Sequence, residues 1–235
     1  MDSDILDEAL RRPLPPDSLT VEIEHSALPL APQPLAWWRR EPGASAPLGA
    51  DILDWVTAGY VLDVGCGTGR DLETLAGRGI PGHGVERTPA AVGQATGAGV
   101  SCVLADVFEY CPPHPVDTVL AIGGNGGMAA TLANLPGFLR RLSSWLSESG
   151  RIVFSSTDWR LLPAEKFALR EPASGYRGDI RMRLALDGVP GPWFPWLFAD
   201  PDALAGACAE AGLRIVARKE WQGGIAYGAL LERAA

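Results

Sequence analysis

The chain has 235 residues, enough for one domain with a sizeable hydrophobic core. Hydrophobic residues make up 47% and charged residues 20%, which argues against a disordered or coiled-coil protein. The formal net charge is −8, and no run of basic residues forms the positive patch on which nucleic-acid binding depends, so nucleic acid is not an expected partner. The 28 glycines and 20 prolines disfavour the long helices of a bundle.

The cysteines and the N-terminal residues indicate in which cellular compartment the protein is found. Cys66, Cys102, Cys111 and Cys208 lack the spacing of a metal site or a disulfide framework, and residues 1–4 are acidic where a signal peptide would be basic. We therefore expect a cytoplasmic protein. No apolar run approaches the roughly 20 residues of a membrane-spanning helix, so no membrane partner is expected. Abundant Ala, Gly and Pro, with only two lysines, suggest a bacterial, GC-rich genome.

Residues 1–50 read as an arm or lid. A short helix is predicted over residues 2–12, after which prolines at eight positions forbid long regular structure. The pair Trp37 and Trp38 is apolar enough to need a cover, so the arm is expected to pack back on the body. Two interpretations stay open: the arm fills a surface groove, or it closes over a ligand.

From residue 51 the pattern alternates between short apolar runs and amphipathic stretches, which indicates an α/β fold with a parallel sheet and crossover helices. Helices are expected over 51–57, 68–78, 89–96 and 132–146. Strands are expected over 60–64, 82–86, 101–105, 116–122 and 151–155, with Gly150 stopping the chain before the last of these.

Residues 157–199 interrupt this alternation. Residues 180–187 alternate between apolar and polar side chains, and residues 187–191 supply a turn, so a β-hairpin insertion is predicted. The regular pattern then resumes with a helix over 201–211 and an antiparallel strand pair over 213–221 and 226–232. The domain plan is an arm over 1–50 and a body over 51–235, with residues 157–199 as an insertion that sets substrate specificity.

The most informative segment is residues 61–70, Val-Leu-Asp-Val-Gly-Cys-Gly-Thr-Gly-Arg, an apolar strand that ends in a glycine-rich loop opening a helix. Glycines let the backbone approach a ligand closely, and the helix start presents free N–H groups. The dinucleotide fingerprint G-x-G-x-x-G requires a third glycine where Arg70 stands, and Gly69 comes one residue early. The pattern is instead D-x-G-x-G-x-G.

In this motif the chain resembles the class I S-adenosylmethionine-dependent methyltransferases. The resemblance implies a Rossmann-like, mostly parallel seven-stranded sheet with helices on both faces and an antiparallel last strand. It places the amino-acid part of S-adenosylmethionine beside the loop, supported by Asp63. The implied cofactor-binding residues of this segment are Asp63, Gly65, Cys66, Gly67 and Gly69.

The ends of the following strands agree with that resemblance. Glu86 ends the second strand, where a carboxylate accepts both ribose hydroxyls, and Arg87 follows it. Asp106 and Val107 match the family's adenine-binding positions, and Gly123 follows the fourth strand. Each acid taken alone could instead be a solvated strand end, and the three loop glycines could serve only a tight turn.

The chemistry implied is methyl transfer, in which holding the two reactants in line supplies much of the rate. A protein base helps only where the acceptor holds its proton. Asp158 and His25 are the candidate catalytic bases, although capping for Asp158 and a surface position for His25 are the commoner uses. Cys111 and His114 form only half of a metal site, so no metal is predicted.

Substrate recognition is expected from the insertion, the arm and the loop after the fourth strand. Aromatic and cationic side chains there favour a ring-bearing or carboxylated small molecule. Arg181 and Arg183 are better interpreted as part of the solvent-exposed face of the hairpin. Two interpretations of Asn125 stay open: its side chain orients a substrate, or asparagine is present because its backbone conformation is favoured in a turn. The candidate substrate-binding residues are Trp38, Asn125, Trp159, Arg160, Tyr176, Trp193 and Trp196.

Three functions compete. The first is an enzyme that moves a methyl group from S-adenosylmethionine to an oxygen or nitrogen of a small molecule, a secondary metabolite being one option, with S-adenosylhomocysteine as the product. The second is a non-catalytic S-adenosylmethionine-binding protein that acts as a sensor or partner subunit. The third, an oxidoreductase, is disfavoured by Arg70. The sequence does not reveal the oligomeric state.

Overall fold

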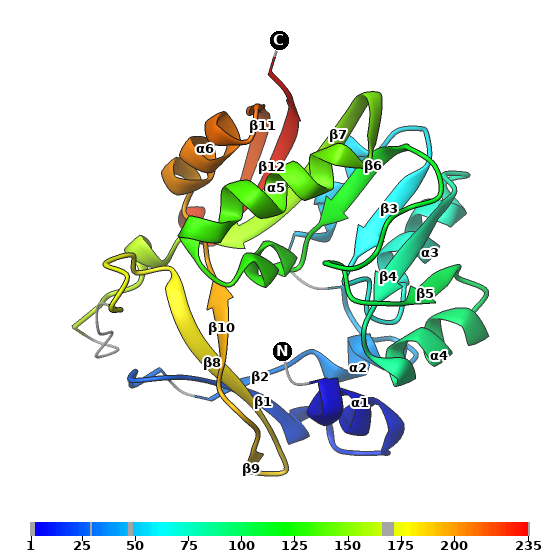
Figure 1. Cartoon of the computed structure of the whole chain (residues 1–235). Helices are drawn as coiled ribbons and strands as arrows, with labels where there is room; N and C mark the ends of the chain where they lie inside the picture. The colour runs from blue at the N-terminus through cyan, green and yellow to red at the C-terminus, as the bar shows by residue number, and fades with distance from the viewer. Residues whose placement is uncertain (1–2, 29, 47–48, 166–171, 235) are drawn as a thin grey trace.

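The computed structural model describes residues 3–28, 30–46, 49–165 and 172–234, and it consists of two β-sheets with helices around them (Figure 1). The larger has seven strands in the order β11-β12-β7-β6-β3-β4-β5 and is called the large sheet below. The other, called the small sheet, contains β1, β2, β8, β9 and β10.

The large sheet is parallel except for β12, which runs antiparallel to both of its neighbours. This confirms the predicted fold class. Its strands are β3 (Val61–Val64), β4 (Gly82–Glu86), β5 (Cys102–Leu104), β6 (Val116–Ala121), β7 (Leu146–Thr157), β11 (Leu213–Trp221) and β12 (Ala226–Arg233).

Helices cover both faces of the large sheet because each has one apolar side. On one face α5 (Leu135–Ser144) packs its leucines and Phe138 on β7, and α6 (Pro201–Glu210) packs Leu204 into the same core beside β11. On the other, α3 (Arg70–Gly77) and the 3₁₀ helix η2 (Ala50–Trp55) form a second core. The helix α4 (Pro89–Gly97) follows β4.

Most expected boundaries differ from the structure by one or two residues, and three elements differ in kind or extent. Residues 50–55 form a 3₁₀ helix in place of an α-helix, and α5 begins only after the 3₁₀ turn η4 (Leu132–Asn134). Gly150 lies inside β7 and does not precede it, because the pairing of β6 with β7 shifts register between Val116 and Thr118 and takes in the extra residues. A side chain at Gly150 would meet Leu146 Cβ at 2.8 Å.

The small sheet joins the arm to the insertion. The predicted hairpin is present as β8 (Asp179–Leu186) and β10 (Phe194–Leu197), with β9 (Val189–Pro190) also paired to β8. The arm was expected to lack long regular structure, yet β1 (Leu19–Ile23) pairs along β8, placing Val21 opposite Leu184. Leu19, Val21 and Ile23 alternate with polar residues, and that alternation suits a strand with one buried face.

The rest of the arm encloses this sheet. The strand β2 (Ala31–Pro32) pairs with β1, and α2 (Leu35–Trp38) follows it. The helix α1 (Ser3–Arg11) confirms the predicted N-terminal helix, whose expected first residue, Asp2, lies outside the described residues. Its Asp7 carboxylate accepts a hydrogen bond of 2.6 Å from the Ala90 N–H, which docks α1 on the start of α4.

Of the helices in the described ranges, none is long and apolar enough to cross a bilayer. Within the same ranges, no group of three or more His, Cys, Asp or Glu side chains is placed to hold a metal ion.

Candidate functional site

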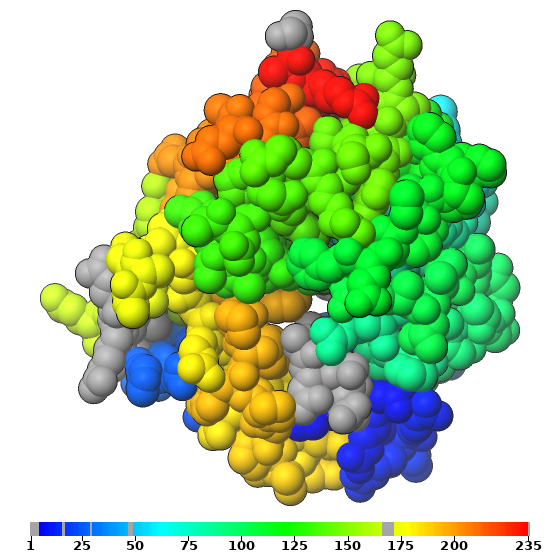
Figure 2. Space-filling model, in the orientation of Figure 1, coloured from blue at the N-terminus to red at the C-terminus, as the bar shows by residue number. Residues whose placement is uncertain are grey.

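A cavity of about 530 Å³ lies between the two sheets, where the strands β3, β4, β5 and β6 end. Loops at the carboxyl ends of parallel strands form one wall, as is usual for ligand sites in open α/β sheets. The small sheet, α1 and α2 form the other. Figure 2 shows a hollow near the centre of the molecule, with green residues above it and orange residues to its left.

The glycines of the loop after β3 share a backbone conformation but differ in their surroundings. Gly65, Gly67 and Gly69 all have positive φ, at 71°, 54° and 76°. A side chain at Gly67 would meet no atom within 4 Å, so this backbone is open to the cavity. A side chain at Gly69 would meet Val100 at 2.8 Å, and Gly69 does not line the cavity, so its position serves packing.

Three carboxylates converge below this loop. Asp63 is 2% exposed, and no side-chain hydrogen bond reaches it from the residues that the structure describes. Burial, followed by the charges of Asp71 and Glu86, raises the pKa of Asp63 well above its usual range, and burial also raises the pKa of Asp71. Such a site is electrostatically suited to a ligand that carries positive charge.

Glu86 ties the loop to the end of β4. Its Oε2 accepts from the Gly67 N–H at 3.0 Å and its Oε1 from the Thr88 N–H at 2.8 Å. A carboxylate has further lone pairs, so both oxygens still have capacity for hydroxyl donors. Asp106 lines the cavity beyond Glu86, and its Oδ1 accepts from the Phe108 N–H at 2.8 Å.

The other expected cofactor residues also lie on this wall. Arg87, Val107 and Gly123 line the cavity, and so does Cys66. The Cys66 Sγ lies 3.4 Å from the Cys102 Sγ, and this hydrogen bond together with burial raises the pKa of the Cys66 thiol. Of the ten candidate cofactor residues, Gly69 is therefore the one that the structure places away from the cavity.

Asn125 follows β6 and holds the glycine-rich loop. Its Nδ2 donates to the carbonyl oxygens of Val64 and Gly65, both at 2.9 Å. The side chain lines the cavity, but its amide donors are used by the loop, so the geometry supports a bracing role more than the expected orientation of a substrate. The neighbouring Gly126 and Gly127 leave room for the Phe154 ring and the Trp196 indole.

The arm forms part of the cavity wall. Trp37 lies under the Arg70 guanidinium, 3.9 Å from the ring centre, and Trp38 lines the cavity beside it. Arg40 donates to the Thr68 carbonyl oxygen at 2.6 Å and pairs with Glu73 at 2.6 Å. These contacts bring the arm onto the glycine-rich loop and the first turn of α3.

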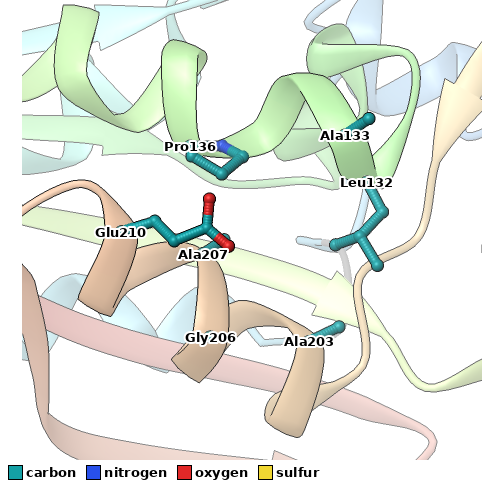
Figure 3. A pocket seen from close by; sticks show the side chains of 7 residues that line it. All are labelled: Leu132, Ala133, Pro136, Ala203, Gly206, Ala207 and Glu210. Atoms are coloured by element: carbon teal, nitrogen blue, oxygen red, sulfur yellow. The ribbon is translucent and has the colours of Figure 1, made fainter.

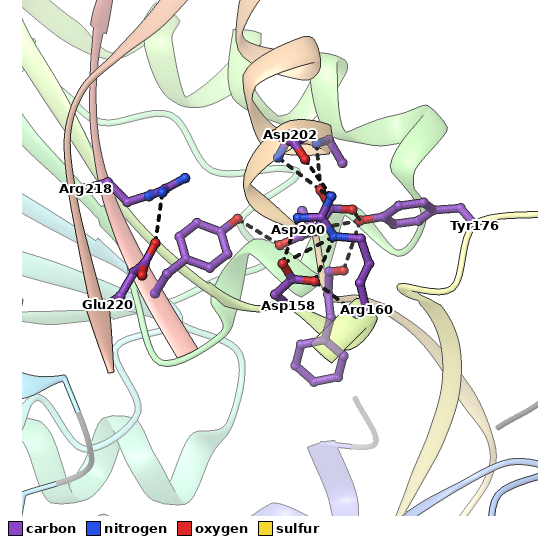
Figure 4. A network of polar contacts seen from close by, with 11 residues as sticks. Asp158, Arg160, Tyr176, Asp200, Asp202, Arg218 and Glu220 are labelled. Carbon is purple, nitrogen blue, oxygen red and sulfur yellow. Dashed lines mark hydrogen bonds and ion pairs between the residues drawn. The ribbon is translucent and has the colours of Figure 1, made fainter. Parts of the chain in front are cut away.

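Asp158 and Arg160 belong to a polar cluster outside the cavity (Figure 4). Arg160 bonds the Asp158 carboxylate at 2.7 Å and also reaches Asp200 at 3.2 Å and Asp202 at 2.5 Å. Burial raises the pKa of Asp158, but the hydrogen bonds from Arg160 outweigh it and hold that pKa below the usual range. A strongly bound carboxylate is a weak base, so the expected catalytic role of Asp158 is not supported.

The same cluster accounts for Tyr176. Its hydroxyl donates to the Asp200 Oδ2 at 2.8 Å and accepts from the Asp200 N–H at 2.8 Å. Tyr176 and Arg160 were expected to contact a substrate, but neither lines the cavity. They join the end of β7 to the start of α6, and so fix both ends of the insertion.

Three more expected residues lie elsewhere. His25 is exposed in the turn after β1 and does not line the cavity, so a catalytic role for it is not supported. Trp159 is buried and stacks on Phe198 with ring centres 5.2 Å apart. Trp193 lies under the Arg183 guanidinium, 4.4 Å away. Of the expected substrate residues, Trp38, Asn125 and Trp196 line the cavity.

Several lining residues were not expected. The alternation within residues 180–186 assigns one face of that strand to a core, but only the pairing with β1 shows that this core borders a cavity. The unpredicted lining residues of the small sheet and arm are Leu6, Leu10, Val21, Gln33, Trp37, Met182, Pro195 and Phe198.

A second hollow of about 290 Å³ lies between α5 and α6 (Figure 3). Apolar or small residues line it, with Glu210 at one side. It brings together none of the expected site residues, so the cavity between the sheets is the candidate site.

Comparison with known proteins agrees with this geometry. The family model described as a methyltransferase domain matches residues 37–218. No curated protein sequence matches the chain significantly.

Among solved structures, a methyltransferase from Bacteroides fragilis, in complex with S-adenosylhomocysteine, is similar with a TM-score of 0.79 at 23% identity; the match covers 99% of this chain and 94% of that one. An amino pentose methyltransferase from Micromonospora echinaspora has a TM-score of 0.57 at 21% identity, covering 88% and 99%. A 1,6-didemethyltoxoflavin N1-methyltransferase from Burkholderia thailandensis has a TM-score of 0.52 at 20% identity, covering 79% and 76%.

These likenesses show a shared fold, and the family model extends over most of the sequence, including the glycine-rich loop and the strand ends around the cavity. The chain belongs to the methyltransferase family and is an S-adenosylmethionine-dependent enzyme of the class I fold.

Proposed function

We propose that this enzyme transfers a methyl group to a nitrogen or oxygen atom of a small-molecule acceptor that occupies the cavity between the two sheets. The similar enzymes from Micromonospora and Burkholderia act on an amino pentose and on 1,6-didemethyltoxoflavin, which supports a small-molecule acceptor. The net charge of −8 agrees with an acceptor other than nucleic acid. A cytoplasmic location is part of the same proposal.

The residues at the strand ends fit the cofactor. The observation that carries this assignment is the buried Asp63 carboxylate, which faces the cavity without a partner among the described residues, next to the open backbone of Gly67. Asp63 would hold the charged amino-acid part, Glu86 the ribose hydroxyls, and Asp106 with Val107 the adenine. When bound, S-adenosylmethionine supplies a methyl group activated by a sulfonium.

The protein's own task is then to position the acceptor and exclude water. Trp38 and Trp196 lie on the acceptor side of the cavity, and Asn125 fixes the loop between the two sides. Correct placement of two reactants can supply roughly 7–11 kcal/mol of a barrier, so no nucleophilic protein residue is required.

Calorimetric titration with S-adenosylhomocysteine tests the cofactor site. We expect binding by the unmodified protein and binding weakened about tenfold or more in Glu86→Ala, since a charged hydrogen-bond acceptor is lost. Glu109→Ala, a change at a carboxylate that does not line the cavity, is the matched control and should bind normally. Equal affinities for all three proteins would show that Glu86 does not hold the ribose.

Transfer to a small acceptor is tested separately. A screen of small amines, phenols and heterocycles with methyl-labelled cofactor should yield at least one labelled product. Tight cofactor binding with no transfer to any of these classes would contradict the proposed small-molecule acceptor.

A further inference from the structure

The cavity has two chemically different sides. Its charged lining residues, as far as the described residues go, all come from the strand ends of the large sheet, the loops that follow them and the start of α3. They are Asp63, Arg70, Asp71, Glu86, Arg87 and Asp106. These residues surround the cofactor positions, which leaves the opposite side to receive the acceptor.

The opposite side is an apolar wall built across three strands. Val21 from β1, Met182 from β8, and Phe194 and Trp196 from β10 all line it. The strand pairing aligns Met182 with Phe194 on one side and with Ile23 on the other, so the apolar residues form one continuous face. Trp38 from the arm extends this face.

The charges of the small sheet lie on its outer face. Arg183 pairs with Glu22 at 2.6 Å and covers the Trp193 ring, and Arg181 pairs with Glu24 at 3.5 Å. Successive side chains of a strand point to opposite faces, so neither arginine reaches the cavity lined by Met182. Arg160, the other cation expected to hold an acidic substrate, is bound to aspartates outside the cavity.

Few hydrogen-bonding groups remain for a polar acceptor. Among the described residues of the arm and small sheet that line the cavity, Gln33 carries the one polar side chain apart from the tryptophan N–H groups. Its Nε2 donates to the Ala31 carbonyl oxygen at 3.2 Å. A buried carboxylate or a set of sugar hydroxyls would be left largely without partners on this wall, which opposes their binding.

From these observations, and resting on the proposed methyl transfer, we infer that the acceptor is a neutral, flat ring system methylated at an atom whose lone pair is free at neutral pH, such as a heteroaromatic ring nitrogen. The aromatic wall favours a flat ring by stacking. The described part of the acceptor wall offers no Asp, Glu, His, Lys, Cys or Tyr side chain as a base, and a ring nitrogen needs none.

The transfer balances without a further reactant. The lone pair of the acceptor nitrogen forms the new bond to the methyl carbon while the carbon–sulfur bond breaks. The electron pair of that bond stays on sulfur, and the positive charge passes to the acceptor nitrogen.

Binding to the protein saturated with S-adenosylhomocysteine tests this inference with three probes. Quinoline is neutral and flat, quinoline-6-carboxylate has the same ring with a charge, and methyl glucosaminide is a polar amino sugar. By calorimetry we expect quinoline to bind at least about tenfold more tightly than either of the others. Equal or tighter binding of the carboxylate or the sugar, or no binding of quinoline, would overturn the inference.

Paired variants locate the binding surface. Trp38→Ala should weaken quinoline binding about tenfold, and Trp193→Ala, which removes an indole from the outer face, should leave it unchanged. If Trp38→Ala does not fold, Met182→Gln and Met182→Leu provide the same comparison, with weakened binding expected only for the glutamine variant. Unchanged quinoline binding in Met182→Gln would contradict the assignment.

The titration separates two kinds of failure. Failure to bind S-adenosylhomocysteine in the first step would refute the proposed function itself. Normal cofactor binding with the wrong order among the three probes would refute only the acceptor class.

Discussion

The two sheets around the cavity use their residues in opposite ways. The large sheet presents backbone groups and carboxylates at its strand ends, including Asp63 and Glu86, and its connections are local in sequence. The small sheet presents apolar side chains from the middle of its strands and pairs β1 with β8, which follows more than half the chain later. Polar recognition here depends on loop geometry, whereas apolar recognition depends on strand register.

The comparison also shows why the two sides are chemically separate. On β8 the alternation sends Arg181 and Arg183 to the outer face, where glutamates of the β1 region neutralise them. A one-residue change of register would turn those arginines into the cavity and Met182 out of it. The register with β1 therefore determines the polarity of the acceptor wall.

The largest effect is expected where the insertion leaves the large sheet. Arg160→Ala should destabilise the fold by about 2–3 kcal/mol, because Asp158 and Asp200 remain buried without their cation. The midpoint of thermal unfolding should fall by roughly 4–12 °C for a protein of this size. Arg218→Ala removes an exposed pair with Glu220 and should change stability by less than about 0.5 kcal/mol. Similar losses in both variants would argue against a specific role for Arg160.

Asp63→Asn tests the large sheet alone. Loss of the carboxylate should weaken S-adenosylhomocysteine binding roughly 10- to 100-fold, since hydrogen bonds to charged groups contribute about 1.5–3 kcal/mol. The exposed Asp17→Asn is the matched control and should bind normally. Stability of both variants should be measured alongside, so that a folding defect is not mistaken for lost binding.

The pH dependence of the same site follows from the raised pKa of Asp63. The free protein keeps a proton on this carboxyl to a higher pH than the unfolded chain does, so its contribution to stability is lost as pH rises through the raised pKa. A cationic ligand favours the carboxylate, so binding below that pKa should release a proton and weaken as pH falls. Calorimetry in two buffers of different ionisation heat measures this release, which should disappear in Asp63→Asn.

Gly127→Ala tests the contact between the two sides. The new methyl group would overlap the Trp196 indole, and overpacking of this kind costs about 1–3 kcal/mol. Gly137→Ala is the control, since a side chain there meets no atom within 4 Å and lies on helix α5. It should be neutral or stabilising by up to about 1 kcal/mol. Equal stability of the two variants would mean that the loop moves freely away from Trp196.

Asp7→Ala tests how the arm is attached and should have the smallest effect. Loss of the bond to the Ala90 N–H at the start of α4 should cost about 1 kcal/mol, and Asp7→Asn should recover most of it. Hydrogen bonding from Arg11 and Ala90 holds the pKa of Asp7 below its usual range despite some burial. The wild-type advantage should therefore be present at neutral pH and shrink as pH falls through that lowered pKa, which urea titrations at two pH values would measure.

Local patterns were sufficient to predict much of the large sheet. The glycine spacing from Gly65 to Gly69 and the acid at Glu86 depend on neighbours close in sequence, and β4, β11 and the hairpin appear at or near the expected residues. The strand over residues 19–23 was not predicted, because flanking prolines masked its alternation and because its partner, β8, is far away in sequence.

The acceptor side was harder to predict for a related reason. Asp158, Arg160 and Tyr176 have the chemistry of substrate contacts, but Arg160 and Tyr176 both bind Asp200, more than twenty residues away from either of them, and Arg160 in turn holds Asp158, so the cluster lies away from the cavity. Asn125 reaches back to the loop at Gly65 in the same way. No local pattern indicates such distant partners.

The pairing of β1 with β8 has a consequence for how the chain is made. Synthesis proceeds from the N-terminus, so β1 emerges from the ribosome long before Asp179–Leu186 exists to receive it. Until then the apolar face of β1 and Trp38 lack their final cover, while β3, β4 and the helix between them already have local partners. Nascent chains that end before β8 should therefore be the species that chaperones bind, and release should follow once residue 186 has left the exit tunnel.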